Sequence, residues 1–139
     1  MQGRFQKISE SPKVIFDAAH NLEGVKVFIK LFKKEFKNYK TCTLIYGALN
    51  DKNNKQMLTL LQSYFIKVYV TSINNERSET TKNLISITKS LKMDASKTNY
   101  PEKIISAFIK NKNRNQQNCL VVLGSIYLLG EIKIKLSKI

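Results

Sequence analysis

The stretch from which the fold can be inferred reads Lys13-Val-Ile-Phe-Asp-Ala-Ala-His-Asn21 and leads into residues 22–36. Its first five residues are an apolar run of strand length that ends in a carboxylate. In residues 22–36, apolar side chains recur at steps of three and four, which places them on one face of a helix. The pattern predicts a strand, a short polar turn and a helix, which is the repeating unit of an α/β domain.

The same alternation continues to the end of the chain. Strand-like runs are residues 41–46, 67–71 and 119–124, and segments of helical period are residues 55–65, 78–91, 101–110 and 125–136. A further short strand is expected before residue 101, and residues 111–118 are predicted to be a polar loop. Such an order requires crossover connections, so we expect a mostly parallel sheet of about five or six strands with helices on both faces. The run at 119–124 is the most hydrophobic and should form a central strand.

Length and composition fit one folded domain. The chain has 139 residues, of which 42% are hydrophobic, and this is enough for a single packed core over residues 1–139. Cys42 and Cys119 lie inside apolar runs, and we expect both to be buried free thiols. The sequence shows no metal-ligand spacing, no disulfide framework, no signal peptide and no apolar stretch long enough to span a bilayer. The default expectation is a cytoplasmic protein.

The formal net charge of +14 raises the question of nucleic-acid binding. A nucleic-acid footprint needs clustered basic residues, often with arginine forks or interleaved aromatic rings. The only arginines are Arg4, Arg77 and Arg114, and the lysines are scattered over every segment. We interpret the excess as a solvated basic surface that helps to attract an anionic nucleotide or polyglutamate substrate. A basic module that binds nucleic acid is kept as an alternative.

Polar side chains follow the first predicted strand, where it turns into the helix. Asp17, His20 and Asn21 fall within five residues, and ligands of parallel α/β sheets bind beyond the carboxyl ends of the strands. Asp17 can accept hydrogen bonds from two ribose hydroxyls, and free N–H groups at the helix start favour an anion. The competing interpretation is that Asp17 and Asn21 are helix caps and that His20, the only histidine, is a surface residue.

Two other strand ends carry polar groups. After the second predicted strand comes a turn in which Gly47 permits close backbone approach and Lys52 can meet a carboxylate or phosphate. After the last predicted strand, the hydroxyls of Ser125 and Tyr127 reach the same edge of the sheet. Ser125 lies outside a Gly-x-Ser-x-Gly elbow and has no second histidine for a triad, so we expect it to donate hydrogen bonds to a ligand. The chain has no phosphate-binding loop and no dinucleotide fingerprint.

Four stretches resemble the carboxy-terminal domain of folylpolyglutamate synthase/dihydrofolate synthase, a branch of the Mur ligase superfamily. They are Gly3-Arg4-Phe5-Gln6, Val14-Ile-Phe-Asp-Ala-Ala-His-Asn21, Gly47-Ala-Leu-Asn-Asp-Lys52 and Gly124-Ser-Ile-Tyr-Leu-Leu-Gly-Glu131. These stretches look like the family's Pro-Gly-Arg, Asp-x-Ala-His-Asn-Pro, Gly-x-x-x-Asp-Lys and Gly-Ser-x-Tyr-x-x-Gly-Glu segments. The matches follow the order of the family over nearly the whole chain, and the second and fourth are specific in combination.

The resemblance implies a Rossmann-like domain of an ATP-dependent ligase that phosphorylates a carboxylate and joins it to glutamate, with ATP and Mg²⁺. By the matched positions, Arg4, Asp17 and Asn21 would bind ATP, His20 would be the catalytic residue at the acyl-phosphate end, and Lys52, Ser125 and Tyr127 would bind glutamate. The implied partners are ATP, L-glutamate, and folate or dihydropteroate. Phosphoryl transfer depends mainly on positioning and charge stabilisation, which suits Arg, Lys and His side chains.

The chain departs from the family pattern in two respects. Leu22 and Gln2 stand where prolines are expected, and the change at Leu22 removes a residue that preorganises a helix start. The family's central domain, which carries the P-loop, the Mg²⁺ ligands and most of the folate site, is absent, so we expect a separate amino-terminal half as partner. The alternatives are that the sequence is a fragment of a longer ligase, or that it is a non-catalytic fold remnant or basic binding module. The sequence leaves open whether dihydropteroate, folate or both are accepted.

Overall fold

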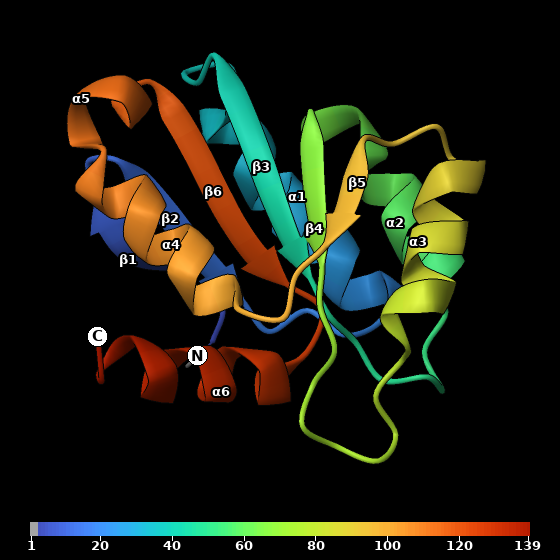
Figure 1. The fold of residues 1–139 in the computed structure, drawn as a ribbon. Coiled ribbons are helices and arrows are strands. Elements are labelled where there is room, and N and C mark those ends of the chain that lie inside the picture. The colour runs from blue at the N-terminus through green and yellow to red at the C-terminus, as the bar shows by residue number, and fades with distance from the viewer. Residues whose placement is uncertain (1–2) are drawn as a thin grey trace.

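The computed structural model describes residues 3–139, and the position of Gln2 lies outside the described residues. Its centre is one six-stranded sheet in the order β1-β2-β6-β3-β4-β5 (Figure 1). The strands are β1 (Gln6–Glu10), β2 (Lys13–Asp17), β3 (Thr41–Tyr46), β4 (Lys67–Val70), β5 (Ala95–Lys97) and β6 (Asn118–Leu123). Neighbouring strands are parallel except for β1 and β2, which are antiparallel. The prediction of a mostly parallel α/β sheet is confirmed.

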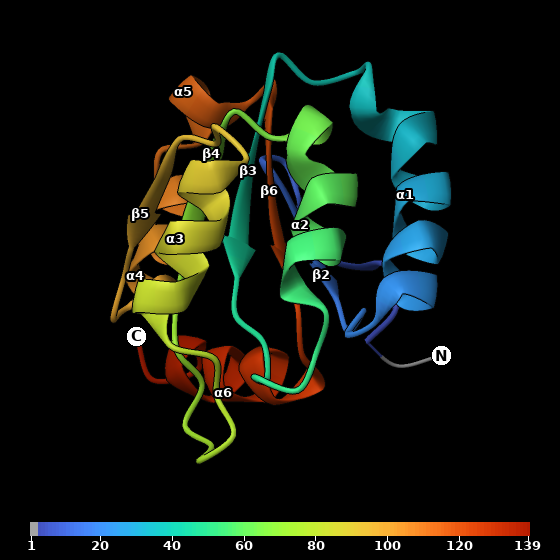
Figure 2. The same ribbon diagram turned by 90° about the vertical axis from the view of Figure 1, so that its right-hand side faces the viewer.

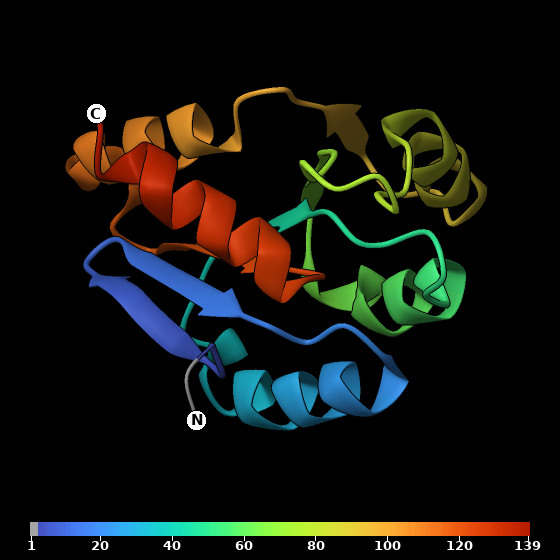
Figure 3. The same cartoon turned by 90° about the horizontal axis from the view of Figure 1, so that it is seen from below.

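Helices cover both faces of the sheet, as predicted. Helices α1 (Leu22–Phe36), α2 (Asn54–Leu61) and α3 (Thr81–Ser90) pack on one face, and Figure 2 shows them side by side. Helices α4 (Pro101–Lys110) and α6 (Ile126–Leu136) pack on the other face. Seen from below, α6 runs across the edge at which the parallel strands end (Figure 3). This helix therefore lies beside the loops that leave the carboxyl ends of the strands.

Strand β6 is the central strand that its composition predicts. Every residue from Cys119 to Leu123 is fully buried. Cys119, Val121 and Leu123 pack with the helices α1, α2 and α3, while Leu120 and Val122 pack with α4 and α6. Because successive side chains of a strand point to opposite faces, a strand with a helical layer on each side is apolar throughout.

Aromatic rings at helical spacing hold α1 against the sheet. Phe28 and Phe32 stack with 5.1 Å between their ring centroids, and Phe32 stacks on Phe65 at 5.7 Å. Phe28 and Phe32 are fully buried. Burial of such a side chain contributes about 1.5–3 kcal/mol, so this face fixes α1 and the strand-to-helix turn that precedes it.

Two elements differ from the sequence prediction because they carry little apolar pattern. Strand β1 is missing from the predicted order, since it is an edge strand whose only apolar residue is Ile8. The prediction that residues 111–118 form only a loop is wrong, because α5 (Lys112–Asn115) is a short helix inside it. All four residues of α5 are polar, so no periodic apolar signal marks this helix.

Two helices begin or end at residues other than the predicted ones. Helix α3 begins at Thr81 rather than at residue 78, because Thr80 Oγ1 accepts a hydrogen bond of 3.1 Å from the N–H of Asn83. The helix predicted at 55–65 ends as α2 at Leu61 and is followed by a 3₁₀ turn.

The two cysteines are buried free thiols, as predicted. Among residues 3–139, no helix is both long and apolar enough to cross a membrane.

Candidate functional site at the carboxyl edge of the sheet

The carboxyl ends of β2, β6 and β3 lie at one level. Asp17 pairs with Leu123, and Leu123 pairs with Tyr46, so the loops after these strands begin side by side. Gly124 has a φ of +131°, and a Cβ atom there would overlap the carbonyl oxygen of Gly47. Glycine is required at this contact because it alone tolerates both the backbone conformation and the close approach. The residues that follow three strands are thereby brought together.

One small cavity lies at this edge, and we call it the strand-end pocket. Its volume is about 240 Å³, and its lining residues are His20, Leu49, Lys52, Arg77, Gly124, Ser125, Ile126 and Tyr127. Four of the residues predicted for the site are among them, namely His20, Lys52, Ser125 and Tyr127. The lining contains two cations and two hydroxyl groups but no carboxylate. This composition suits a small anionic ligand that accepts hydrogen bonds.

Lys52 belongs to residues 47–53, which we call the Lys52 loop. The hydroxyl of the fully buried Tyr46 donates to Asn54 Oδ1 at 2.6 Å, and Asn54 Nδ2 donates to the carbonyl oxygen of Leu49 at 3.2 Å. These bonds tie the loop to the start of α2. Within residues 3–139, the Lys52 ammonium group forms no salt bridge. It is therefore available to a ligand carboxylate.

Ser125 and Tyr127 open helix α6. Ser125 is the N-cap and is 3% exposed, and its Oγ accepts a hydrogen bond of 3.1 Å from the N–H of Tyr127. The serine hydroxyl can still donate one hydrogen bond, because it is both a donor and an acceptor. His20 Nδ1 lies 3.2 Å from the carbonyl oxygen of Ala18 and not against Ser125. Ser125 thus has a hydrogen-bonding role and no activating base.

Asp17 is buried rather than open to a ligand. It is 1% exposed, its Oδ2 accepts from the N–H of Phe5 at 2.9 Å, and its Oδ1 accepts from the N–H of Ala19 at 2.8 Å. Burial raises the pKa of Asp17, although the two backbone hydrogen bonds and the charge of Arg4 act in the opposite direction. A ribose contact would use the carboxylate lone pairs that these bonds leave free, and it stays a prediction.

His20 and Asn21 lie at the start of α1. Asn21 Oδ1 accepts a hydrogen bond of 2.8 Å from the N–H of Gly24, so Asn21 is a helix cap, as the competing interpretation expects. His20 is exposed and lines both the strand-end pocket and a neighbouring cavity of about 450 Å³ that Asn21 also lines. His20 therefore lies between two cavities and can contact ligands in both.

Arg4 lines neither of these cavities. It belongs to the N-terminal segment, which is held by the hydrogen bonds from Phe5 to Asp17 and from the N–H of Ala18 to the carbonyl oxygen of Gly3. The charge of Arg4 is close enough to lower the pKa of Asp17. Among the described residues, the two predicted sets meet in the neighbouring cavity, which both Asn21 and Lys52 line, whereas Ser125 and Tyr127 line only the strand-end pocket.

Arg77 lines the strand-end pocket and was not singled out by its sequence pattern. It belongs to residues 71–80, which we call the Arg77 loop, between β4 and α3. The loop shows no strand-end motif, and the one available signal is that the chain has only three arginines. Arg77 Nη1 lies 3.3 Å from Asp51 Oδ2, which places the guanidinium group against the Lys52 loop.

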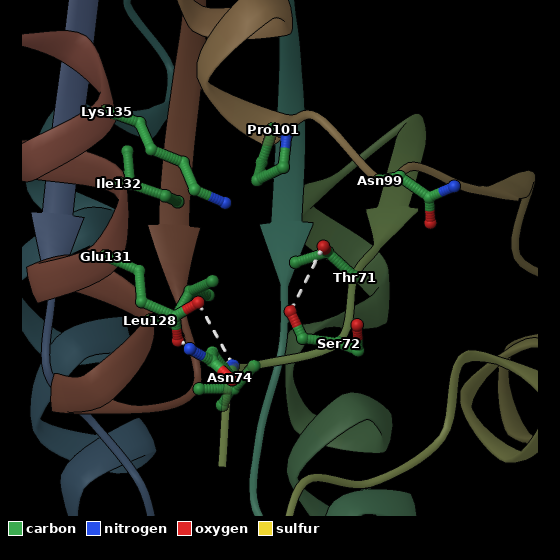
Figure 4. Close-up of a pocket in the computed structure, with 10 residues that line it drawn as sticks. Thr71, Ser72, Asn74, Asn99, Pro101, Leu128, Glu131, Ile132 and Lys135 are labelled. Atoms are coloured by element: carbon green, nitrogen blue, oxygen red, sulfur yellow. Dashed lines mark hydrogen bonds between the residues drawn. The ribbon is translucent and has the colours of Figure 1, made fainter. Parts of the chain in front are cut away.

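A further cavity is lined by the beginning of the Arg77 loop and by α6, and we call it the α6 pocket (Figure 4). Its volume is about 300 Å³. Both carboxylate oxygens of Glu131 accept hydrogen bonds from the N–H of Asn74, at 3.0 and 2.9 Å. None of the residues predicted for the site lines this cavity. The two hydrogen bonds of Glu131 hold the beginning of the Arg77 loop against α6.

Comparisons with known proteins identify the family of the domain. A family profile described as "Mur ligase, glutamate ligase domain" matches residues 3–126. The chain is 27% identical over 134 residues to the dihydrofolate synthase/folylpolyglutamate synthase of Bacillus subtilis, which covers 96% of this chain and 30% of the relative. The chain spans about a third of the length of the proteins it matches.

Solved structures match the fold. FolC of Escherichia coli in complex with DHPP and ADP gives a TM-score of 0.84 at 24% identity, over 99% of this chain and 32% of that chain. A bifunctional folylpolyglutamate synthase/dihydrofolate synthase with Mn, AMPPNP and L-glutamate bound gives a TM-score of 0.82 at 20% identity, over 99% and 32% of the two chains. At these identities, the likeness establishes a shared fold.

Proposed function

Because this chain belongs to the Mur ligase family through its glutamate ligase domain, we propose that it is the glutamate-binding part of an ATP-dependent folate–glutamate ligase. The observation that carries the proposal is the convergence of His20, Lys52, Ser125 and Tyr127 on one pocket whose lining has no carboxylate. These residues follow three different strands, as expected of an active site at the carboxyl edge of a parallel sheet.

L-glutamate occupies the strand-end pocket in this proposal. The Lys52 ammonium group pairs with the α-carboxylate, and the hydroxyls of Ser125 and Tyr127 donate hydrogen bonds to the same ligand. The volume of about 240 Å³ lies below the roughly 300–1,000 Å³ of pockets for drug-sized ligands, which suits a single amino acid. Close packing around a small ligand also orients its amine, which must approach the activated carboxylate from one direction.

The reaction joins a carboxylate of folate or dihydropteroate to the glutamate amine. The acceptor carboxylate takes the γ-phosphoryl group of ATP, which gives an acyl phosphate and ADP. The amine nitrogen then attacks the acyl carbon, the bond from that carbon to the phosphate oxygen breaks, and an amide, inorganic phosphate and a proton are released. His20, exposed between the two cavities, stabilises the negative charge of the acyl phosphate. Either tetrahydrofolate polyglutamylation, dihydrofolate synthesis or both fit this chemistry.

ATP is shared with a second domain in this proposal. Arg4 contacts its phosphates, and Asp17 and Asn21 serve its ribose end beside the strand-to-helix turn. Within residues 3–139, no group of three or more His, Cys, Asp and Glu side chains is arranged to hold a metal ion. In this proposal, the P-loop and the Mg²⁺ ligands belong mainly to that second domain. Residues 1–139 then form one Mur ligase C-terminal-like domain, for which a cytoplasmic location stays a prediction.

A ligation assay tests the proposal. Incorporation of labelled L-glutamate into dihydropteroate or tetrahydrofolate is measured with ATP and Mg²⁺, using the chain alone, a P-loop-containing ligase half alone, and both together. We expect product only when both are present. His20→Ala and Lys52→Ala should each lower kcat/KM at least about tenfold, equivalent to about 1.4 kcal/mol. Lys138→Ala, at the exposed C-terminus, serves as the control and keeps the rate. The proposal is overturned if the complete pair is inactive, or if His20→Ala and Lys52→Ala both retain full activity.

A further inference from the structure

The strand-end pocket contains a second cation besides Lys52, the guanidinium group of Arg77. Glutamate carries two carboxylates, and the proposed function provides a cation for only one of them. We propose that Arg77 binds the side-chain carboxylate of the incoming amino acid, so that Lys52 and Arg77 together restrict it to a dicarboxylate. This inference rests on the proposed function, because it requires glutamate to bind in this pocket.

Backbone hydrogen bonds hold the Arg77 loop against the Lys52 loop. The carbonyl oxygen of Arg77 accepts a hydrogen bond of 2.7 Å from the N–H of Asn50, and the N–H of Glu79 donates to the carbonyl oxygen of Ala48 at 2.8 Å. Both bonds lie directly after the Cα atom of Arg77, on either side of Ser78, which forms an antiparallel bridge with Leu49. The two cations of the pocket are therefore presented by neighbouring loops whose spacing is fixed.

Glu131 anchors the beginning of the Arg77 loop to α6. Figure 4 shows its carboxylate directed at the backbone of Asn74, and both of its oxygens accept that N–H, at 3.0 and 2.9 Å. The same helix carries Ser125 as its N-cap and Tyr127 in its first turn. One helix thus lines the pocket and sets the path of the loop that carries Arg77, so we assign Glu131 as a positioning residue for Arg77.

The guanidinium group of Arg77 is able to accept a new carboxylate partner. It is paired with Asp51 through a single contact of 3.3 Å, and the two side chains are 54% and 49% exposed. Exposed ion pairs of this kind contribute little to stability and exchange readily. Arginine has five N–H donors in a planar fork that matches a carboxylate, so donors remain for a ligand. Asp51 holds Arg77 near the pocket without occupying the pocket itself.

Calorimetric titration with L-glutamate and L-glutamine tests the inference, with the chain alone and with the P-loop half present. The two amino acids have nearly the same shape and differ in the side-chain carboxylate. We expect the wild type to bind glutamate at least about tenfold more tightly than glutamine. Arg77→Gln should remove that preference by weakening glutamate binding alone, whereas Lys52→Gln should weaken both ligands. Arg114→Gln, which removes an arginine from α5 outside the pocket, should keep the wild-type preference.

The outcomes separate the inference from the proposed function. If the wild type prefers glutamate and Arg77→Gln keeps that preference, the assignment of Arg77 is overturned and the proposed function stands. If the wild type binds no glutamate in either preparation, the proposed function is overturned and the inference with it.

The positioning role of Glu131 has its own test. We expect Glu131→Ala to speed amide hydrogen exchange at Asn74 and to reduce the preference for glutamate over glutamine. Glu131→Gln, which keeps one acceptor oxygen, should restore part of both properties. Faster exchange at Asn74 with an unchanged preference would overturn the positioning role.

Discussion

Asp17 Oδ2 accepts a hydrogen bond of 2.9 Å from the backbone N–H of Phe5, twelve residues earlier in the chain. Phe5 has a φ of +45°, a conformation that residues other than glycine rarely adopt. The second oxygen of Asp17 is bonded to the N–H of Ala19. The sequence pattern assigns the Asp17 carboxylate to a ligand. In the structure, this carboxylate holds the N-terminal segment against the strand-to-helix turn.

Replacement of Asp17 should destabilise the fold. Asp17→Ala leaves the N–H groups of Phe5 and Ala19 without their acceptor at a buried position, and we expect a loss of about 1–3 kcal/mol in the free energy of unfolding. Urea denaturation at pH 7 measures the loss. Asp94→Ala is the control, because Asp94 is 71% exposed and pairs with Lys67, and it should cost less than about 1 kcal/mol. Equal effects of the two changes would contradict the fastening role.

The stabilising contribution of Asp17 should also depend on pH. Burial raises the pKa of Asp17 above its usual value of 3.8, so the folded state holds this proton more tightly than the unfolded state. The stabilisation that arises from this raised pKa is fully present below pH 3.8, and it is lost as the pH rises through the pKa of Asp17 in the folded state. The difference in unfolding free energy between wild type and Asp17→Ala should therefore narrow as the pH rises above 3.8. A difference that widens with rising pH would show that the backbone hydrogen bonds outweigh burial.

Replacement by alanine should change the stability of the fold in opposite directions at two glycines near the site. At Gly124, a Cβ atom would overlap the carbonyl oxygen of Gly47, and the φ of +131° is unfavourable for alanine. We expect Gly124→Ala to cost about 3 kcal/mol or more and to abolish glutamate binding. At Gly130, inside α6, a Cβ atom meets nothing within 4 Å, so Gly130→Ala should stabilise by about 0.5–1 kcal/mol. Thermal melts measure the stability of both variants, and titration with glutamate measures their binding. A Gly124→Ala variant that is stable and still binds glutamate would refute the packing argument.

The Tyr46 hydroxyl should matter more than that of an exposed tyrosine. Tyr46→Phe removes the donor to Asn54 Oδ1 in a fully buried setting, and we expect a cost of about 1–3 kcal/mol and a more mobile Lys52 loop. Tyr100→Phe is the matched control, because Tyr100 is 56% exposed, and it should change stability by less than about 0.5 kcal/mol. Unfolding curves give the costs, and amide exchange of Lys52 gives the mobility. No difference between the two variants would count against the buried network.

Elements with a strong apolar pattern were predictable from the sequence. The bounds of β2, α1, β3 and α4 follow directly from apolar runs and helical spacing. Strand β1 was not predictable, because an edge strand paired on one side needs few apolar residues and carries only Ile8. The polar helix α5 escapes prediction for the same reason, since its stability comes from neighbours rather than from an apolar face.

The candidate site was predictable where residues directly follow strands. His20, Lys52, Ser125 and Tyr127 converge because parallel strands end at one edge. Arg77 reaches the pocket through a loop whose path depends on Glu131, 57 residues away from Asn74 in the chain, and no local pattern encodes such a contact. The buried state of Asp17 likewise depends on a distant backbone partner, Phe5.

The central claim is that L-glutamate binds in the strand-end pocket, and the most direct measurement is an NMR titration of the isotope-labelled chain with L-glutamate. The account predicts shifts at the backbone amides of Lys52, Arg77 and Ser125, and none at Asn111 and Asn118, which line a different cavity. Shifts confined to Asn99 and Lys135 of the α6 pocket would contradict it, as would the absence of shifts at saturating L-glutamate both with the chain alone and with the P-loop half present.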